Sequence, residues 1–488
     1  MNTVLLEIAV VALGILLLLA DSFVDRSDKN YISFLGALGL GVILVLSFIF
    51  PPIAPSPDSP VAAFVTSDLL SLFFIRFLLV STIVVVLMAP SFRPVLERYV
   101  PAERAGGGIG EFAILPIFSC AGLMWMVQAV DFIMIFVALE LATITLYILV
   151  TYLRQNQASL EAGTKYLILG ALSTGFLVYG ITWIFGVTGT TNLNDLAPAI
   201  QLLPESSHTP LLFGIALVLV ALSFKIAAFP FQFWVPDVYR GAPTPITAYL
   251  SVASKAAGFV VLIRLLLALE GVSFLAHKLE AVITLLAILT LIFGNFAAIP
   301  QTNLKRLLGY SSIAHAGYLL IGLASLGSAL AIPAIGFYFA GYLGMTLLSF
   351  LVLLIVTENT GGDDISRFNG LSQRSPLLAG AMLLSMASLA GIPFTAGFIG
   401  KFLIFEVAIH QGHYGLVVIG CVTVAAGFYY YFKVVRAMYW QQPSELTPIP
   451  LSATVKILIA VMGAGILALG IYPNPVLAAL QPVVTTLH

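Results

Sequence analysis

The sequence predicts an all-α polytopic membrane protein with about fourteen transmembrane helices and two inverted five-helix repeats, each containing a broken helix. Three features predict this fold: an apolar composition, a regular series of apolar runs, and basic residues that fall in alternate loops. Of the 488 residues, 60% are hydrophobic and 9% are charged, whereas soluble domains carry about 25% charged residues. Because so few polar residues cannot cover a soluble surface, lipid must be the solvent for most of the chain.

Fourteen apolar runs approach or exceed the length of about 20 residues that a bilayer-crossing helix needs. The first run contains Glu7 and follows no basic segment, so we expect a retained helix rather than a signal peptide. The glycines at 105–110 follow no strand and lack the lysine of a phosphate-binding loop, so a loop between helices is expected there. The runs cover residues 3–21, 31–50, 68–89, 111–127, 130–150, 164–187, 211–241, 244–269, 279–299, 306–325, 332–356, 376–411, 414–440 and 453–472.

The basic residues between the runs support this even number of crossings. Thirteen fall in one set of alternate loops, and only Lys278 falls in the other set. Since cytoplasmic loops carry the excess of Lys and Arg, both termini are expected on the non-cytoplasmic side of a bacterial inner membrane. The thirteen are Arg26, Lys29, Arg93, Arg98, Arg104, Arg154, Arg240, Lys305, Arg306, Arg367, Arg374, Lys433 and Arg436.

Two runs contain near-identical breaks, AAFPF at 227–231 and AGIPF at 390–394, marked by Pro230 and Pro393. Five crossings separate the two copies, so the second would run through the membrane in the opposite direction. This arrangement is typical of inverted repeats, whose broken helices meet functional sites near the middle of the membrane. Two ordinary proline kinks are the alternative interpretation.

The repeat divides the chain without creating a soluble domain. We predict one membrane domain over residues 1–488, in which four segments follow one another. They are three helices in about 1–110, the first repeat (helices 4–8) in 111–269, the second repeat (helices 9–13) in 279–440, and helix 14 in 453–472.

Four ionisable residues lie too deep in the runs to reach the surface: Glu140, Lys225, Lys255 and Lys401. A Lys or Asp at a helix centre costs about 2.5–3.5 kcal/mol on insertion, so such residues face the protein interior and serve a function. Burial favours the neutral amine, and a nearby carboxylate favours the charged one. Moving the carboxylate would switch the lysine between holding and releasing a proton, which predicts a gated proton relay.

Other polar residues in the runs allow two interpretations. Lys165 either belongs to the relay or extends its amine to the membrane surface. His315 either passes protons or is a hydrogen-bonded core histidine. Arg264 is expected to reach the surface or to pair with Glu270. No pair of histidines has the spacing of a metal or haem site, so no cofactor is predicted in this chain.

Several stretches resemble one family of membrane subunits over essentially the whole chain. They are FVALELATITLYILV, EAGTKYLILGALSTGFLVYGI, FKIAAFPFQFWVPDVYRGAPTPITAYLSVASKAAGF, NLKRLLGYSSIAHAGY and LAGIPFTAGFIGKF, in that order. In these stretches the chain resembles the antiporter-like membrane subunits of respiratory complex I. It is most similar to the N type of bacterial NADH-quinone oxidoreductase. Lys401 fits this type, because the M type resembles a version with Glu there. The short segment after the last span lacks the long lateral helix of the L type.

The resemblance implies a function and a set of partners. Such subunits hold no redox centre, and NADH, FMN, iron–sulfur clusters and quinone would belong to partner subunits. Quinone reduction elsewhere would drive protons through this chain, which would contact other membrane-arm subunits, including another antiporter-like subunit, and membrane lipids, but no nucleic acid. Family positions on helices 5, 7, 8 and 12 match Glu140, Lys225, Lys255 and Lys401, and Lys165 matches a lysine on helix 6.

Two other functions remain open from the sequence. A subunit of a multisubunit sodium/proton antiporter would share the broken helices and the buried lysines. A standalone transporter of an organic substrate would need a substrate cavity, of which the sequence gives no sign.

Overall fold

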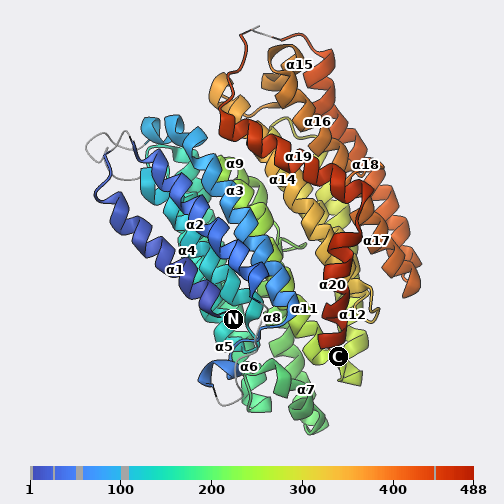
Figure 1. The fold of residues 1–488 in the computed structure, drawn as a ribbon. Coiled ribbons are helices and arrows are strands. Elements are labelled where there is room, and N and C mark those ends of the chain that lie inside the picture. The colour runs from blue at the N-terminus through green and yellow to red at the C-terminus, as the bar shows by residue number, and fades with distance from the viewer. Residues whose placement is uncertain (1–3, 26–27, 51–58, 100–108, 444–446, 488) are drawn as a thin grey trace.

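The structure, a computed structural model, is a bundle of long helices (Figure 1). It describes the chain except residues 1–3, 26–27, 51–58, 100–108, 444–446 and 488. Arg26, Arg104 and most of the glycine-rich 105–110 stretch therefore lie outside the described residues. Figure 1 shows the N-terminal helices on the left and the C-terminal helices on the right, with both marked chain ends in the lower half.

Thirteen helices of the described chain are long and apolar enough to cross a membrane. A short 3-10 turn precedes α8, and a π-helical turn at 250–254 joins α10 and α11 into one span. The spans are α1 Val4–Asp21, α2 Asn30–Ile49, α3 Leu69–Tyr99, α4 Ile109–Gln128, α5 Phe132–Val150, α6 Gln157–Thr188, α8 His208–Ile226, α10 Thr244–Tyr249 with α11 Lys255–Glu270, α12 Ser273–Ala298, α13 Leu304–Ala324, α14 Ala331–Thr360, α18 Tyr414–Trp440 and α19 Ala453–Ile471.

A fourteenth apolar segment is divided into α16, Pro376–Ala390, and α17, Ala396–His410. The all-helical fold is thus confirmed, and every predicted run corresponds to one helix or one pair of helices. The ends differ most at α3, which continues to Tyr99 past two prolines, and at α6. The Asn156 side chain accepts hydrogen bonds from the first turn of α6, so this helix begins in polar sequence ahead of its apolar run.

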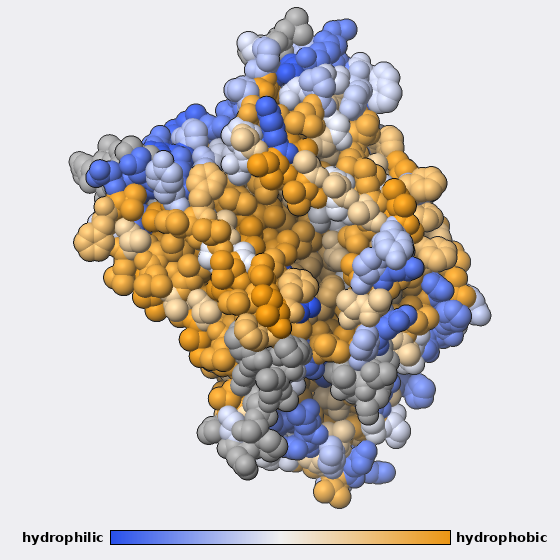
Figure 2. Space-filling model, viewed as in Figure 1, coloured by the Kyte–Doolittle hydropathy of each residue, from blue (hydrophilic) through white to orange (hydrophobic). Residues whose placement is uncertain are grey.

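Apolar residues dominate the middle of the face in Figure 2, and hydrophilic residues gather mostly toward its two ends. This distribution fits a bundle whose sides contact lipid and whose ends contact water. The side of the membrane on which the termini lie stays a prediction.

Both predicted breaks are present. The first lies between α8 and α9, Trp234–Gly241, and the second between α16 and α17. Each upstream helix ends at a residue with left-handed backbone, Ala227 with φ 64° and Gly391 with φ 92°. A left-handed residue after the last turn is a common way to end a helix. Pro230 and Pro393 lie inside the breaks, but the residues that end the helices precede them, and the inverted relation of the repeats stays a prediction.

Two helices lie where loops were expected. The amphipathic α7, Leu193–Gln201, is capped by Asn192, whose side chain accepts a hydrogen bond from the Asn194 backbone N–H. At the end of the chain, α20, Asn474–Leu487, packs against α14 and α3. Leu480 of α20 is fully buried against Gly336, where an added Cβ atom would lie 2.7 Å from Leu480. Both helices are too short to span a bilayer, so a search for apolar runs could not detect them.

Arg264 makes a buried contact that the sequence analysis predicted incorrectly. Its guanidinium does not pair with Glu270; it forms a two-pronged ion pair with Asp68, with N···O distances of 2.9 and 3.0 Å. The Ser71 hydroxyl and the backbone oxygen of Val127 accept its remaining hydrogen bonds. Burial acts to raise the pKa of Asp68, but the Arg264 charge and hydrogen bonds from Arg264 and Ser71 hold that pKa below its usual value.

We expect Asp68→Asn to destabilise the protein by about 3 kcal/mol, because it leaves the Arg264 charge buried without a counter-charge. Thermal unfolding of the purified protein measures the loss. Asp68→Asn combined with Arg264→Met should cost less than Asp68→Asn alone. Equal stability of Asp68→Asn and the wild type would show that the pair contributes nothing. Because the folded pKa is lowered, the pair's contribution is present above about pH 3.9 and is lost as the pH falls through the folded value.

Candidate functional site

The three deepest lysines lie inside the bundle and not against lipid. The exposed fractions of Lys225, Lys255 and Lys401 are 5%, 3% and 5%. Each lies beside an irregularity of its helix: Lys225 in the last turn of α8, Lys255 directly after the π-helical turn, and Lys401 in α17 after the second break. Such irregularities are common at functional sites, because they free backbone groups to make other hydrogen bonds.

Glu140 and Lys225 approach each other through threonines instead of forming an ion pair. Glu140, on α5, is half-buried and accepts a hydrogen bond of 2.6 Å from the Thr174 hydroxyl of α6. The Lys225 amine donates to the Thr143 hydroxyl of α5 at 3.1 Å. Thr143, Thr174 and Lys225 line one small cavity, together with Tyr147. The amine therefore lines this cavity directly, and the acid is linked to it through the Thr174 hydroxyl.

Lys255 is the next amine along the bundle. It donates to the backbone oxygen of Ser312 at 2.7 Å and to the Ser312 hydroxyl at 2.9 Å, both on α13. Gly258, one turn after Lys255, lets the Lys225 side chain approach: a Cβ atom at Gly258 would lie 3.1 Å from Lys225 Cγ. Lys225 and the helix that carries Lys255 are thus in direct contact.

His315 continues the polar row from α13 and is 2% exposed. Its Nδ1 atom lies 2.6 Å from the Tyr338 hydroxyl, and its Nε2 atom lies 3.1 Å from the Tyr431 hydroxyl. The Tyr431 hydroxyl also contacts the hydroxyl of Ser311, the neighbour of Ser312. Both ring nitrogens have hydroxyl partners, an arrangement that suits a neutral imidazole with one donating and one accepting nitrogen.

Lys401 binds the end of the broken helix. Its amine donates to the backbone oxygens of Leu389 at 2.8 Å and Ala390 at 2.9 Å, the last two residues of α16. Helix ends leave such oxygens without partners and carry partial negative charge, so they favour a cation. The amine also lies 5.0 Å from the centre of the Tyr318 ring. Lys401 makes no direct hydrogen bond to His315 in the described chain.

Lys165 lies apart from this row. Its side chain is 41% exposed and forms ion pairs with Glu161 at 2.6 Å and Asp237 at 2.7 Å. Arg306 approaches the same Asp237 at 3.7 Å. The structure does not bring Lys165 together with the buried amines, and its role as a relay residue stays a prediction.

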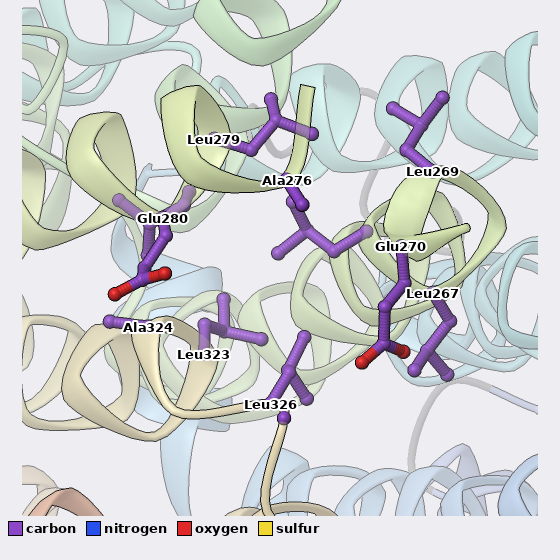
Figure 3. A pocket seen from close by; sticks show the side chains of 12 residues that line it. Leu267, Leu269, Glu270, Ala276, Leu279, Glu280, Leu323, Ala324 and Leu326 are labelled. Atoms are coloured by element: carbon purple, nitrogen blue, oxygen red, sulfur yellow. The ribbon is translucent and has the colours of Figure 1, made fainter. Parts of the chain in front are cut away.

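A separate pocket of about 150 Å³ lies between the end of α11, the start of α12 and the end of α13 (Figure 3). Leucines form half of its lining residues, and Glu270 and Glu280 lie on opposite sides in this view. None of the predicted relay residues lines it. In the part of the chain that the structure describes, no three His, Cys, Asp or Glu residues are grouped to hold a metal ion.

The hydroxyl groups around the lysines were missed by the sequence analysis. Thr143 and Tyr147 lie in the same stretch as Glu140, at three and seven residues further along the helix, so their shared face was a usable signal. The other partners come from other spans, and nothing in a single sequence indicates their contacts. They are Thr174, Ser312, Tyr338 and Tyr431.

Comparisons with known proteins agree with this fold. Residues 129–427 match the family described as NADH:quinone oxidoreductase/Mrp antiporter, TM. The chain is also 40% identical to the NADH-quinone oxidoreductase subunit N of Trichlorobacter lovleyi, over 99% of this chain and 97% of that protein. This chain belongs to the NADH:quinone oxidoreductase/Mrp antiporter family. The resemblance to the antiporter-like subunits of complex I, and to their N type, is therefore confirmed.

Solved structures share this arrangement of helices. A chain of respiratory complex I from Thermus thermophilus with bound aureothin is 30% identical, with a TM-score of 0.79, and the match covers 97% of this chain and 98% of that one. A chain of the Mrp complex from a Dietzia species has a TM-score of 0.83 at 20% identity, covering 99% and 97%. The similarity to the Mrp chain shows the fold alone. Because both chains share this fold, only sequence identity distinguishes the oxidoreductase subunits from the antiporters.

Proposed function

We propose that this chain is a proton-translocating membrane subunit of an NADH-quinone oxidoreductase, and that protons pass along Glu140, Lys225, Lys255 and Lys401. His315 and its tyrosine partners connect the central lysine toward the last one. Redox chemistry, with NADH, FMN, iron–sulfur clusters and quinone, takes place in partner subunits of the complex. The chain crosses a bacterial inner membrane with both termini on the non-cytoplasmic side.

One observation supports this proposal most strongly: the three lysines of the proposed path have neutral partners, whereas the equally buried Lys29 pairs with the Asp21 carboxylate at 2.8 Å. A lysine held by a fixed carboxylate stays charged, because neutralising it would leave the acid buried and unpaired. The partners here are the Thr143 hydroxyl for Lys225, Ser312 for Lys255, and backbone oxygens for Lys401. These partners can hold either form of the amine. The lysines can therefore gain and lose protons without leaving a buried carboxylate unpaired.

The free energy of a pKa shift in one lysine is comparable to the work of moving one charge across the membrane. Moving one charge across 100 mV requires about 2.3 kcal/mol. A shift of two pKa units in one lysine, such as a change of partner produces, is equivalent to about 2.7 kcal/mol. A gated pair of Glu140 and Lys225 would therefore supply a large part of one transfer across the membrane.

The proposal predicts that Glu140→Gln lowers quinone-linked proton pumping by about tenfold, because Gln cannot exchange a proton with Lys225. Glu140→Asp keeps an ionisable carboxylate and should retain more activity. Proton uptake by vesicles that contain the intact complex measures both variants, and assembly is checked by copurification. Equal pumping by both variants and the wild type would remove Glu140 from the mechanism.

A subunit of a multisubunit sodium/proton antiporter is the second candidate, because the description of the matched family includes Mrp antiporters. The two candidates differ in their partners. Copurification with flavin and iron–sulfur subunits supports the oxidoreductase, and sodium-dependent exchange by a complex without those subunits supports the antiporter.

A further inference from the structure

Tyr147 carries a buried hydroxyl group that no described residue satisfies. The residue lies on α5 and is 9% exposed, and its Oη atom is enclosed without a hydrogen-bond partner among the residues that the structure describes. An unpaired buried hydroxyl costs free energy that a phenylalanine would avoid. The ring itself is held by an edge contact with Tyr166, with centroids 4.9 Å apart. Packing therefore accounts for the ring of Tyr147 but not for its hydroxyl.

The position of Tyr147 relates it to the acid and the amine. Glu140, Thr143 and Tyr147 recur at helical spacing, so they share one face of α5. Tyr147 lies about 10 Å along the helix axis from Glu140. Thr143, between them, accepts the hydrogen bond from Lys225. Tyr147 thus follows Glu140 and Thr143 on the face of α5 that contacts Lys225.

Two hollows meet at Tyr147. An open groove of about 510 Å³ runs between α5 and α6 from Glu140 to Thr151, where α5 ends. A small cavity of about 10 Å³ lies behind it and is lined by Lys225. Tyr147 and Thr174 line both hollows. A space of about 10–15 Å³ holds one water molecule, and a water needs polar partners such as these hydroxyl groups.

A glycine on α6 makes room for the hydroxyl. A Cβ atom at Gly170 would lie 1.9 Å from Tyr147 Oη. Any other residue at this position would push the hydroxyl out of its place between the two hollows. The sequence thus keeps both a polar group and the space that it occupies.

We propose that Tyr147 is a positioning residue whose hydroxyl holds a water molecule between Glu140 and Lys225, so that protons pass between them through that water. The inference rests on the proposed function. In the transfer, the charged amine gives one proton to the water, and the water gives another proton to the Glu140 carboxylate. The water is regenerated, the amine and the acid both become neutral, and the reverse transfer restores the charges.

Two variants remove the hydroxyl contact in different ways. Tyr147→Phe deletes the oxygen and keeps the ring, and Gly170→Ala keeps the oxygen but displaces it. Each should slow quinone-linked proton uptake by the intact complex about fivefold, the equivalent of about one lost hydrogen bond. Each should also increase the ratio of the rates in H₂O and D₂O, which a loss of packing alone would not change. The double variant should be no slower than either single variant, because both remove the same contact.

Two controls match these changes. Tyr249→Phe removes a buried tyrosine hydroxyl that hydrogen-bonds Thr82, away from the relay. Gly180→Ala introduces a clash on α6 outside the groove, since a Cβ atom there would lie 2.7 Å from the Gly214 oxygen. Neither control should change the isotope effect of the assembled complex.

The results separate this inference from the proposed function. Normal rates and isotope effects in Tyr147→Phe, measured beside a Glu140→Gln variant whose pumping is strongly reduced, would overturn the role of Tyr147 and leave the proposed function standing. Normal pumping by Glu140→Gln would remove Glu140 from the proton path and Tyr147 with it, whereas sodium-dependent exchange by a complex without flavin and iron–sulfur subunits would overturn the proposed function itself.

Discussion

Lys225→Ala is expected to abolish most quinone-linked proton pumping, by about tenfold or more, while the complex still assembles. Lys225 donates a hydrogen bond to Thr143, which lies one turn after Glu140 on α5, and within the described chain this is the one hydrogen bond of its amine. Without it, Glu140 has no adjacent proton carrier inside the bundle. Removing one bond to a hydroxyl leaves no buried charge behind, so the structural cost is modest compared with the functional one.

Packing requires a second variant at this position. The Lys225 stem fills the space beside Gly258, so alanine also leaves a small cavity. Lys225→Met restores that volume without a titratable group and should be as inactive as alanine. Lys456→Met provides a control, because Lys456 is exposed at the start of α19. Proton uptake in vesicles measures all three, and normal pumping by assembled Lys225→Met would exclude Lys225 as a carrier.

Lys401 should show two separable effects. Lys401→Met leaves the backbone oxygens of Leu389 and Ala390 buried without a donor, at a cost of about 1–3 kcal/mol for each unsatisfied group. We therefore expect less assembled complex as well as lost pumping. Lys401→Arg keeps donors at the end of α16 but cannot lose its proton. That variant should assemble and still lose pumping by about tenfold.

The two Lys401 variants distinguish a carrier from a structural cap. The amount of assembled complex, measured after purification, reports the cap, and the rate of proton uptake per assembled complex reports the carrier. An arginine variant that pumps at the wild-type rate would show that the group at position 401 never changes its charge.

The fold was predictable because a bilayer imposes a simple rule on the sequence. Apolar length and the alternation of basic residues located every span, since each backbone group must be satisfied within its own helix. A search for apolar runs cannot detect helices that lie outside those runs, so α7 and α20 were missed. It also located the ends of α3 and α6 poorly, because these helices continue beyond their apolar segments.

The depth of the relay residues was predictable, but their partners were not. Lys225, Lys255 and Lys401 are buried as expected, since a charge in an apolar run has few other places to go. Arg264 shows the limit of this reasoning. Its nearest acid in the sequence is Glu270, yet its partner is Asp68, 196 residues away. Contacts between distant spans depend on how helices pack, and a single sequence carries no record of that packing.

The central claim is that buried amines exchange protons through water-filled gaps, and ordered water in the intact complex tests it most directly. A density map at a resolution that shows single water molecules would locate them. We predict waters that join Glu140 to Lys225, Lys225 to Lys255, and His315 to Lys401, with one of them bonded to the Tyr147 hydroxyl. Dry, close-packed side chains in all of these gaps, in every state of the working complex, would contradict the account.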